Sequence, residues 1–337
     1  MLKMATEERI LLIRMDGIGD AALCIPALQG LAERYPGAGF GAVCSRTNAA
    51  LFSPALADIY VYEPDEAEAL SDRLRTAGYQ RAMIATEEVA GYRLGRHAGI
   101  AQRVGFWHGW QKPFKSLWQR AQLTSAVYRP AAWRDDPEHE VVTLYRLALV
   151  LGANAPPPSD ARSLARWLNV PPAAQRSAEP GIVRVQVTAK SFTQNWSPVS
   201  WAELIVALQE RLSSPRCELV ASEREARLAA AILQQVPAAH RAENRITVRA
   251  GTDLPQWLDA LAASAIVFTP DSGAAQVAGM LGIPVVDIFE EHDFNRLTRQ
   301  WRPWAAPSRC LPKPRCEPEA PQRFAASLAA AARELLA

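Results

Sequence analysis

The sequence predicts an α/β protein made of two domains, each built on a parallel β-sheet. Short apolar runs alternate with helix-type periodicity in both halves of the chain, which is typical of a parallel sheet with crossover helices. A proline-rich stretch separates the two halves. The length of 337 residues agrees with this, because a typical domain has about 150 residues.

The strands of the first half are short and apolar throughout, as residues 10–13 (Ile-Leu-Leu-Ile) are. This is expected of strands whose two faces are both covered by helices. We expect strands at residues 9–15, 40–44, 59–62, 81–85 and 102–106. Helical patterns follow at residues 20–34, in a short helix after residue 44, and at residues 66–77.

The second half repeats this alternation. We expect strands at residues 182–188, 217–221, 246–249, 265–269 and 284–289. Helical patterns lie at residues 200–212, 223–233, 254–263 and 272–281. Two such units would face each other across an interdomain cleft lined by the carboxyl ends of both sheets, where folds of this class bind ligands.

The domain boundaries follow from the proline-rich stretches. We place the first domain at residues 1–170, the second at residues 171–320 and a final helix at residues 321–337. A helix at residues 139–151 precedes the linker, which spans residues 152–180. We expect the apolar stripe of the final helix to pack back on the first domain.

Composition and charge exclude several classes of protein. The 37 Lys and Arg against 35 Asp and Glu leave a net charge of +2, too small to attract nucleic acid in bulk. No apolar run approaches the roughly 18 residues of a membrane span. Acids precede the first apolar run, unlike a signal peptide, so we expect a cytoplasmic protein.

The five cysteines are odd in number and lie mostly in apolar runs, which favours reduced thiols over a disulfide scaffold. Only Cys310 and Cys316 are placed to pair, across a proline-rich loop. Two thiols fall short of the four ligands of a structural zinc site, so we expect no metal.

The first motif that carries chemistry lies between the first strand and the first helix, at residues 14–20 (Arg-Met-Asp-Gly-Ile-Gly-Asp). Gly17 and Gly19 permit a tight turn, and the amides that open the helix can bind a phosphate. The alternative is that Asp20 caps the helix. The dinucleotide fingerprint is incomplete, because Ala22 stands at its last glycine position.

The second motif also lies between a strand and a helix. Asp271, Ser272 and Gly273 would converge at a helix N-terminus that suits a diphosphate and sugar hydroxyls, unless they only cap that helix. A third motif contains Trp196 and Trp201, for which packing is the alternative role.

Taken together, the chain resembles glycosyltransferase family nine, the ADP-heptose:lipopolysaccharide heptosyltransferases. The resemblance rests on the order and spacing of motifs along nearly the whole chain. These are residues 10–28, Arg103-Val104-Gly105-Phe106, His139 before an apolar helix, the two tryptophans, Asp271-Ser272-Gly273 and residues 282–286.

The resemblance implies a GT-B fold, in which two Rossmann-like doubly wound domains face an interdomain cleft. It implies metal-independent inverting transfer of a heptose or related sugar from ADP-heptose to a lipopolysaccharide core. Asp20 matches the family's acidic residue and would be the general base. A carboxylate suits that role, since it takes the proton of the acceptor hydroxyl as this attacks the anomeric carbon.

The resemblance also implies a donor site on the second domain, which departs from the family at three positions. Gln276 and Gln194 stand where the family usually has His and Lys, and Glu290 stands where it usually has Gly. Lys190 is a candidate to reach the phosphates instead. The expected donor-binding residues are Asp271, Ser272, Gly273, Gln276, Gln194, Lys190 and Glu223.

For the acceptor, the resemblance implies an anionic glycolipid, bound at the inner face of the inner membrane by a peripheral protein. Residues 96–129 interleave basic and aromatic side chains and could face such a lipid, or could be a solvated loop. The expected acceptor-binding residues are Gly17, Gly19, Arg14, Arg103, Lys112 and Lys115.

Two other functions remain open. A GT-B sugar-nucleotide epimerase has the same layout but needs no acceptor. The neutral residues Gln194 and Gln276 also allow a catalytically degenerate family member that acts as a binding protein.

Overall fold

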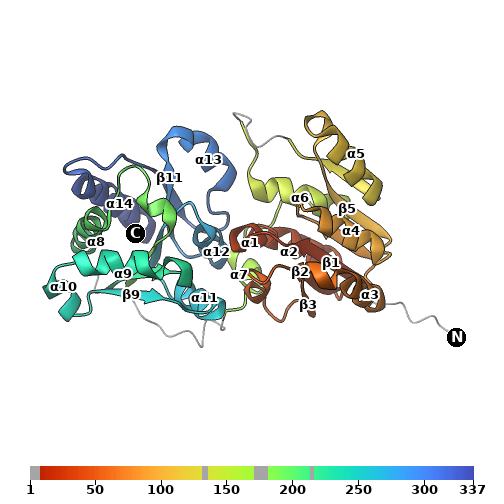
Figure 1. The fold of residues 1–337 in the computed structure, drawn as a ribbon, viewed down its shortest axis with the longest axis horizontal. Helices are drawn as coiled ribbons and strands as arrows, with labels where there is room; N and C mark the ends of the chain where they lie inside the picture. The colour runs from red at the N-terminus through yellow and green to blue at the C-terminus, as the bar shows by residue number, and fades with distance from the viewer. Residues whose placement is uncertain (1–7, 131–135, 171–180, 213–215) are drawn as a thin grey trace. The chain divides into compact units, whose positions relative to one another are not determined.

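The computed structural model describes residues 8–130, 136–170, 181–212 and 216–337. The chain divides into two compact units, Met1–Asn169 and Val170–Ala337. In the described residues, each unit holds one six-stranded parallel sheet flanked by helices (Figure 1). The α/β prediction is therefore confirmed. No helix among these residues is both long and apolar enough to span a membrane, and all five cysteines are free.

The sheet of the first unit has the strand order β3-β2-β1-β4-β5-β6. The central strands are buried because helices cover both faces. Leu11 and Ile13 of β1 (Arg9–Arg14), for example, pack in one core cluster with side chains of α3 (Ala67–Ala77) and α4 (Val89–His97). The strands are β1 (Arg9–Arg14), β2 (Gly39–Cys44), β3 (Asp58–Val61), β4 (Arg81–Ile84), β5 (Gln102–Trp107) and β6 (Ser125–Tyr128). The edge strand β6 was not predicted, because it is short and half-exposed.

The predicted helix at residues 20–34 is two helices, α1 (Ile18–Ala22) and α2 (Ile25–Arg34). Pro26 interrupts the helix because it has no N–H to donate to the preceding turn. The short helix after residue 44 is a 3₁₀ turn, Ala49–Leu51. The other helices are α3 (Ala67–Ala77), α4 (Val89–His97), α5 (Pro113–Gln122), α6 (Glu140–Val150) and α7 (Ala161–Ala165).

The expected linker at residues 152–180 is in large part folded. It contains α7, and Leu168 forms a β-bridge to Phe52 of the first unit. Trp167 is buried and donates its indole N–H to Gln29 Oε1 at 3.0 Å. These apolar side chains anchor the segment despite its prolines, so the linker prediction is wrong up to residue 169. Residues 171–180 lie outside the described residues.

The sheet of the second unit has the strand order β12-β11-β10-β7-β8-β9. Its strands are β7 (Ile182–Gln186), β8 (Arg216–Ala221), β9 (Ile246–Ala250), β10 (Ile266–Pro270), β11 (Val285–Glu290) and β12 (Ser308–Lys313). Strand β12 lies within the proline-rich stretch and was not predicted. It tolerates Pro312 because it is an edge strand that pairs with β11 alone.

The helices of the second unit are α8 (Pro198–Leu212), α9 (Ala226–Gln235), α10 (Ala238–Ala242), α11 (Leu254–Ala262), α12 (Gly273–Leu281), α13 (Phe294–Trp301) and α14 (Ala320–Leu336). Helix α13 was not predicted. Its side chains are mostly half-exposed, so it lacks a continuous buried stripe.

The final helix α14 packs against α8 of its own unit, as Figure 1 shows, and its apolar residues belong to that unit's core. The expectation that it packs on the first domain is wrong. The ring centroids of Phe324 and Trp196 lie 5.9 Å apart, and Leu328 is 1% exposed. The two tryptophans, whose ring centroids are 5.3 Å apart, therefore have the packing role.

This packing predicts the effect of shortening Leu328. Leu328→Ala removes a fully buried side chain and should lower the free energy of unfolding by about 2–5 kcal/mol. Leu336→Ala, at a half-exposed position of the same helix, should change it by less than about 0.5 kcal/mol. Urea denaturation followed by tryptophan fluorescence measures both. Equal effects of the two variants would contradict the packing of α14 on α8.

Candidate functional site

In the first unit, polar side chains collect after the carboxyl ends of the strands. Asp16 and Asp20 follow β1, Glu87 follows β4, His108 follows β5 and Arg129 follows β6. Parallel strands all end at the same edge of the sheet, so residues far apart in sequence meet there.

Arg14, the last residue of β1, organises the two aspartates. Its Nη2 lies 2.9 Å from Asp20 Oδ1, and its Nε lies 3.0 Å from Asp16 Oδ2. It also donates to the carbonyl of Ala85. Burial alone would lower the pKa of the Arg14 guanidinium, but the surrounding acidic groups raise it. Because Arg14 is 6% exposed and holds these partners, it positions Asp20 rather than facing solvent.

Asp20 does not cap α1. The N-cap residue is Gly17, with no side-chain hydrogen bond, and Asp20 lies in the first turn of the helix. Its side chain is 38% exposed. Arg14 holds Oδ1, whereas no hydrogen bond from the described residues reaches Oδ2. A Cβ on Gly17 would lie 3.3 Å from Oδ2, so this glycine leaves the free oxygen open.

A second cluster surrounds Glu87, which the sequence analysis missed. His108 Nε2 and Arg129 Nε each lie 3.4 Å from its carboxylate, and Lys112 and Lys115 each lie 3.7 Å from it. Contact with His108, together with the positive charges of Arg129 and Lys112, lowers the pKa of Glu87 to about 2 despite its partial burial.

Arg129 continues this cluster inward, because its Nη2 lies 2.9 Å from the buried Glu140. The predicted residues Lys112 and Lys115 thus come together, but Arg103 does not join them. It lies at the start of β5, where it donates to the carbonyls of Gln122 and Ile100. Which basic residues share a site depends on how strands that are distant in sequence pair, and the sequence alone does not show this.

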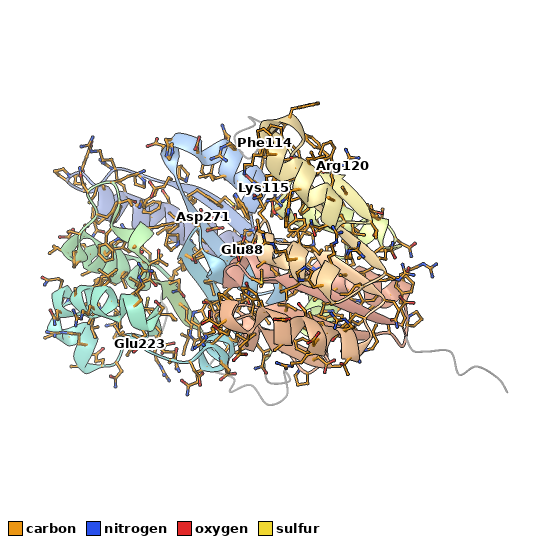
Figure 2. All side chains as sticks on the ribbon, turned by 45° about the vertical axis from the view of Figure 1, so that its right-hand side comes forward. Glu88, Phe114, Lys115, Arg120, Glu223 and Asp271 are labelled. Atoms are coloured by element: carbon orange, nitrogen blue, oxygen red, sulfur yellow. The ribbon has the colours of Figure 1, made fainter. Side chains whose placement is uncertain are left out.

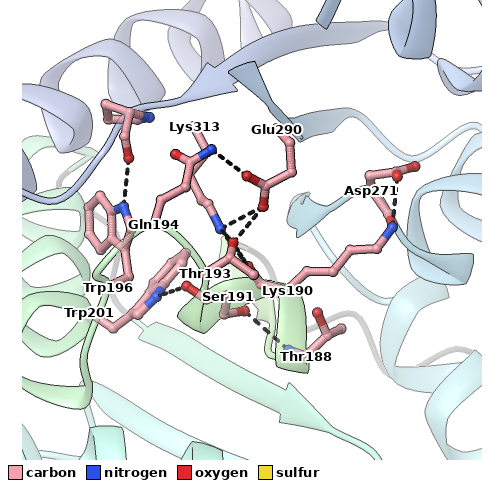
Figure 3. A network of polar contacts seen from close by, with 11 residues as sticks. Thr188, Lys190, Ser191, Thr193, Gln194, Trp196, Trp201, Asp271, Glu290 and Lys313 are labelled. Carbon is pink, nitrogen blue, oxygen red and sulfur yellow. Dashed lines mark hydrogen bonds and ion pairs between the residues drawn. The ribbon is translucent and has the colours of Figure 1, made fainter. Parts of the chain in front are cut away.

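In the second unit, Lys190 and Asp271 form an ion pair beside the N-terminus of α12 (Figure 3). Lys190 lies in a 3₁₀ turn, Ala189–Phe192, after β7, and its Nζ lies 2.7 Å from Asp271 Oδ2. Ser272 caps α12, since its hydroxyl accepts from the Ala274 amide. Lys190 and the predicted motif therefore lie together at this edge, and the capping alternative is also correct for Ser272.

Behind Lys190 lies a charge pair that the sequence analysis missed. Lys313, at the end of β12, is 1% exposed, and its Nζ lies 3.0 Å from Glu290 Oε1. It also donates to the carbonyl of Lys190 at 2.5 Å and to Thr193 Oγ1 (Figure 3). Burial lowers the pKa of Lys313, although Glu290 opposes this.

Glu290 also accepts from the side chain of Gln194. Burial acts to raise the pKa of Glu290, but hydrogen bonds from Thr193 and Lys313 lower it, so it stays ionised. Gln194 and Asn195 have φ angles of 57° and 66°, in the left-handed region. Two successive strained residues of this kind persist only where the surroundings hold them, as the Cys316 amide does at 2.9 Å from the Gln194 carbonyl.

The two remaining donor candidates lie apart from this ion pair. Gln276 is buried and donates to the Trp301 carbonyl at 2.5 Å, which ties α12 to the end of α13. Glu223 is exposed, and it is Glu225 that reaches the turn with Lys190, by accepting from the Ala189 amide at 3.1 Å. The carboxylate that contacts the turn with Lys190 is thus Glu225, and not the expected Glu223.

Under Asp271 lies Asp287, a fully buried residue of β11. Within the described chain neither of its carboxyl oxygens has a hydrogen-bond partner that meets ordinary geometry. Burial, and then the charge of Asp271, raise its pKa well above 3.8. Burial therefore favours the neutral, protonated form of the Asp287 carboxyl group.

Comparisons with known proteins agree with this architecture. The profile of glycosyltransferase family 9 (heptosyltransferase) matches residues 68–323. None of the curated proteins compared with the chain is a significant match.

Solved structures share the fold over their full length. The structure of Escherichia coli ADP-heptose lps heptosyltransferase II is 20% identical, with a TM-score of 0.73 over 98% of this chain and 100% of that one. A family 9 glycosyl transferase from Veillonella parvula is 13% identical, with a TM-score of 0.71 over 99% and 98%. E. coli heptosyltransferase WaaC with ADP is 19% identical, with a TM-score of 0.69 over 96% and 99%.

The burial of Asp287 predicts a pH-dependent stability. The folded state keeps a proton that the unfolded chain releases above about pH 4, so the wild type loses stability as the pH rises. Asp287→Asn has no proton to lose and should gain stability relative to the wild type, by up to about 1.4 kcal/mol per pH unit. Thermal unfolding at a series of pH values measures this. Glu317→Gln, at an exposed acid of the same unit, is the control and should show no such trend.

Proposed function

The chain belongs to glycosyltransferase family 9, the heptosyltransferases, and on that premise we propose that it transfers a heptose from ADP-heptose to a lipopolysaccharide core. Asp20 is the general base of this proposal. The observation that carries it is the carboxylate of Asp20, held at one oxygen by the buried Arg14 and open at the other beside Gly17.

The chemistry requires one proton transfer and one displacement. Asp20 Oδ2 takes the proton of an acceptor hydroxyl, and the acceptor oxygen forms a bond to the anomeric carbon of the heptose. The bond from that carbon to the diphosphate breaks at the opposite face, and ADP leaves with the electron pair. A base of this kind accelerates such a step by roughly 10²–10⁴-fold.

The second unit supplies the charge that the departing diphosphate needs. Lys190 is half-exposed, and the Gly273 amide opens α12, where free N–H groups favour an anion. The ion pair with Lys313 neutralises Glu290, so this acid does not repel the phosphates. The transfer we propose needs no metal ion, because Lys190 and the free amides of α12 stabilise the charge on the departing diphosphate. ADP as the nucleotide is supported by WaaC, whose structure holds ADP.

The first unit supplies the acceptor site. Lys112, Lys115 and Arg129 gather around Glu87, and Arg129 also pairs with Glu140, so three cations outnumber two carboxylates and the cluster suits a phosphorylated glycan. An acceptor anchored in lipid would bring the enzyme to the inner face of the inner membrane as a peripheral protein.

Asp20→Asn tests the base. This variant keeps the size of the side chain but cannot accept the proton, so kcat should fall by about 10²–10⁴-fold while the affinity for ADP stays unchanged. Turnover of ADP-heptose with a lipopolysaccharide-core acceptor measures kcat, and calorimetry measures ADP binding. Asp65→Asn, at an exposed acid of the same unit, is the control. Unchanged turnover in Asp20→Asn would contradict the assignment of Asp20 as the general base.

The same assay separates the other two functions. Conversion of the nucleotide sugar without any acceptor would indicate an epimerase. No binding of ADP-, UDP-, GDP- or CMP-sugars in calorimetry would indicate a degenerate member that does not use these donors.

Lys190→Met tests the donor site. It removes a charge-assisted hydrogen bond and leaves Asp271 unpaired near the phosphates, so the Kd for ADP should rise about tenfold to a hundredfold. Lys190→Arg keeps the charge and should recover part of the loss. Arg323→Gln, at an exposed cation of the same unit, should not change the Kd. Wild-type affinity in Lys190→Met would place the phosphates elsewhere.

A further inference from the structure

Helix α5 buries polar side chains and exposes apolar ones, apart from Trp118, which packs against the core of the first unit. Its buried side chains are Ser116, Gln119 and Gln122, whereas Phe114 and Leu117 are 89% and 73% exposed. A surface helix normally buries its apolar stripe and exposes its polar one. Ser116 accepts from the His108 amide and Gln122 from Arg96, but the side-chain amide of Gln119 has no hydrogen-bond partner within the described chain.

The turn before α5 adds a third apolar side chain to the same exposed surface. Trp110 is 94% exposed, although its neighbours His108 and Gly109 are buried. Gly109 has a φ of 59°, and a Cβ there would lie 3.1 Å from the Tyr128 ring. The glycine therefore permits a turn that other residues would strain, and this turn carries Trp110 outward.

Cations flank these apolar side chains. No acid occurs between Glu88 and Asp135, whereas this run holds eight Lys and Arg in a chain whose net charge is only +2. Figure 2 shows Phe114, Lys115 and Arg120 on α5. We call the α5 face the surface formed by Trp110, Lys112, Phe114, Lys115, Leu117 and Arg120.

We propose that the α5 face docks on an anionic lipid bilayer, with its three apolar side chains in the interfacial region and its cations at the headgroups. Trp and Phe at the tip of a basic helical surface are typical of segments that lie in the plane of a membrane. Lys and Arg can extend their charged ends to the phosphates while their methylene stems stay among apolar groups.

The charge is what favours a bilayer over a protein partner. A second copy of the chain would bring the same cations face to face and be repelled, whereas anionic headgroups attract every one of them. Glu87 compensates part of the charge of Lys112 and Lys115, but Arg120 lies over the ring of Trp107, 4.7 Å from its centroid. The face therefore remains positive.

The test is cosedimentation of the full chain with vesicles. We expect binding to vesicles of phosphatidylcholine with phosphatidylglycerol, little binding to phosphatidylcholine alone, and weaker binding at high salt because exposed charges are screened. The absence of binding by the wild type, or binding that ignores both anionic lipid and salt, overturns the proposal.

Two sets of variants separate the apolar and the charged contributions. Trp110→Ser, Phe114→Ser and Leu117→Ser together should weaken binding to anionic vesicles by more than about tenfold. Lys112→Gln, Lys115→Gln and Arg120→Gln should each weaken it by about fivefold. Leu336→Ser and Arg162→Gln, at exposed positions outside the α5 face, are the matched controls and should bind as the wild type does.

Folding and insertion are checked separately. Circular dichroism should show native structure in the triple serine variant, because the three side chains are exposed. Brominated lipids should quench tryptophan fluorescence in the wild type, and Trp110→Phe should still bind but lose most of that quenching. Quenching that persists in Trp110→Phe overturns the proposal.

A self-association of the wild type in solution that the triple serine variant abolishes would assign the α5 face to a contact between copies and overturn the proposal too. The proposal rests on the proposed function only in that a lipid acceptor explains the docking. Binding of ADP is measured without vesicles, so either proposal can fail alone, and the triple serine variant should bind ADP as the wild type does.

Discussion

The parallel direction of the strands is the constraint on which the rest of the structure depends. Each sheet is buried between helices, so its strands carry apolar side chains, and polar groups are displaced to the loops at the strand ends. All carboxyl ends lie at one edge, and residues distant in sequence meet there. The meeting residues are Arg14, Asp20, Glu87, His108 and Arg129 in the first unit, and Lys190, Asp271, Glu290 and Lys313 in the second.

Two of these residues are buried cations, and each determines where a more exposed group lies. Arg14 holds Asp20 by one oxygen, and Lys313 holds the turn that carries Lys190 by its backbone carbonyl. Charges are expensive to bury unless they are paired, so each cation is tied to a carboxylate. The positions of the more exposed groups, Asp20 and Lys190, are thus fixed by partners that are themselves buried.

The sequence was sufficient for the strands of both sheets, apart from β6 and β12, because buried parallel strands are continuous apolar runs. It also placed Asp20, Lys190 and Asp271 after such runs, and the structure has them after β1, β7 and β10. The sequence did not identify Lys313 as a site residue, because it lies in a proline-rich stretch. It did not identify Glu87 either, because the cations that surround Glu87 come from other loops. Helix α5 was missed because its buried side chains are mostly polar and give no apolar stripe. Helix α14 was assigned to the wrong domain because periodicity predicts that an apolar stripe is buried but does not show against which element.

The pair of Lys313 and Glu290 also constrains how this chain could have diverged from its relatives. A single exchange of Glu290 would leave an ammonium group buried without a counterion, and a single exchange of Lys313 would leave the acid uncompensated beside Lys190. Intermediates with one change are disfavoured, so we expect the two positions to change together among relatives. A glutamine at position 194, which hydrogen-bonds Glu290, belongs to the same epistatic unit.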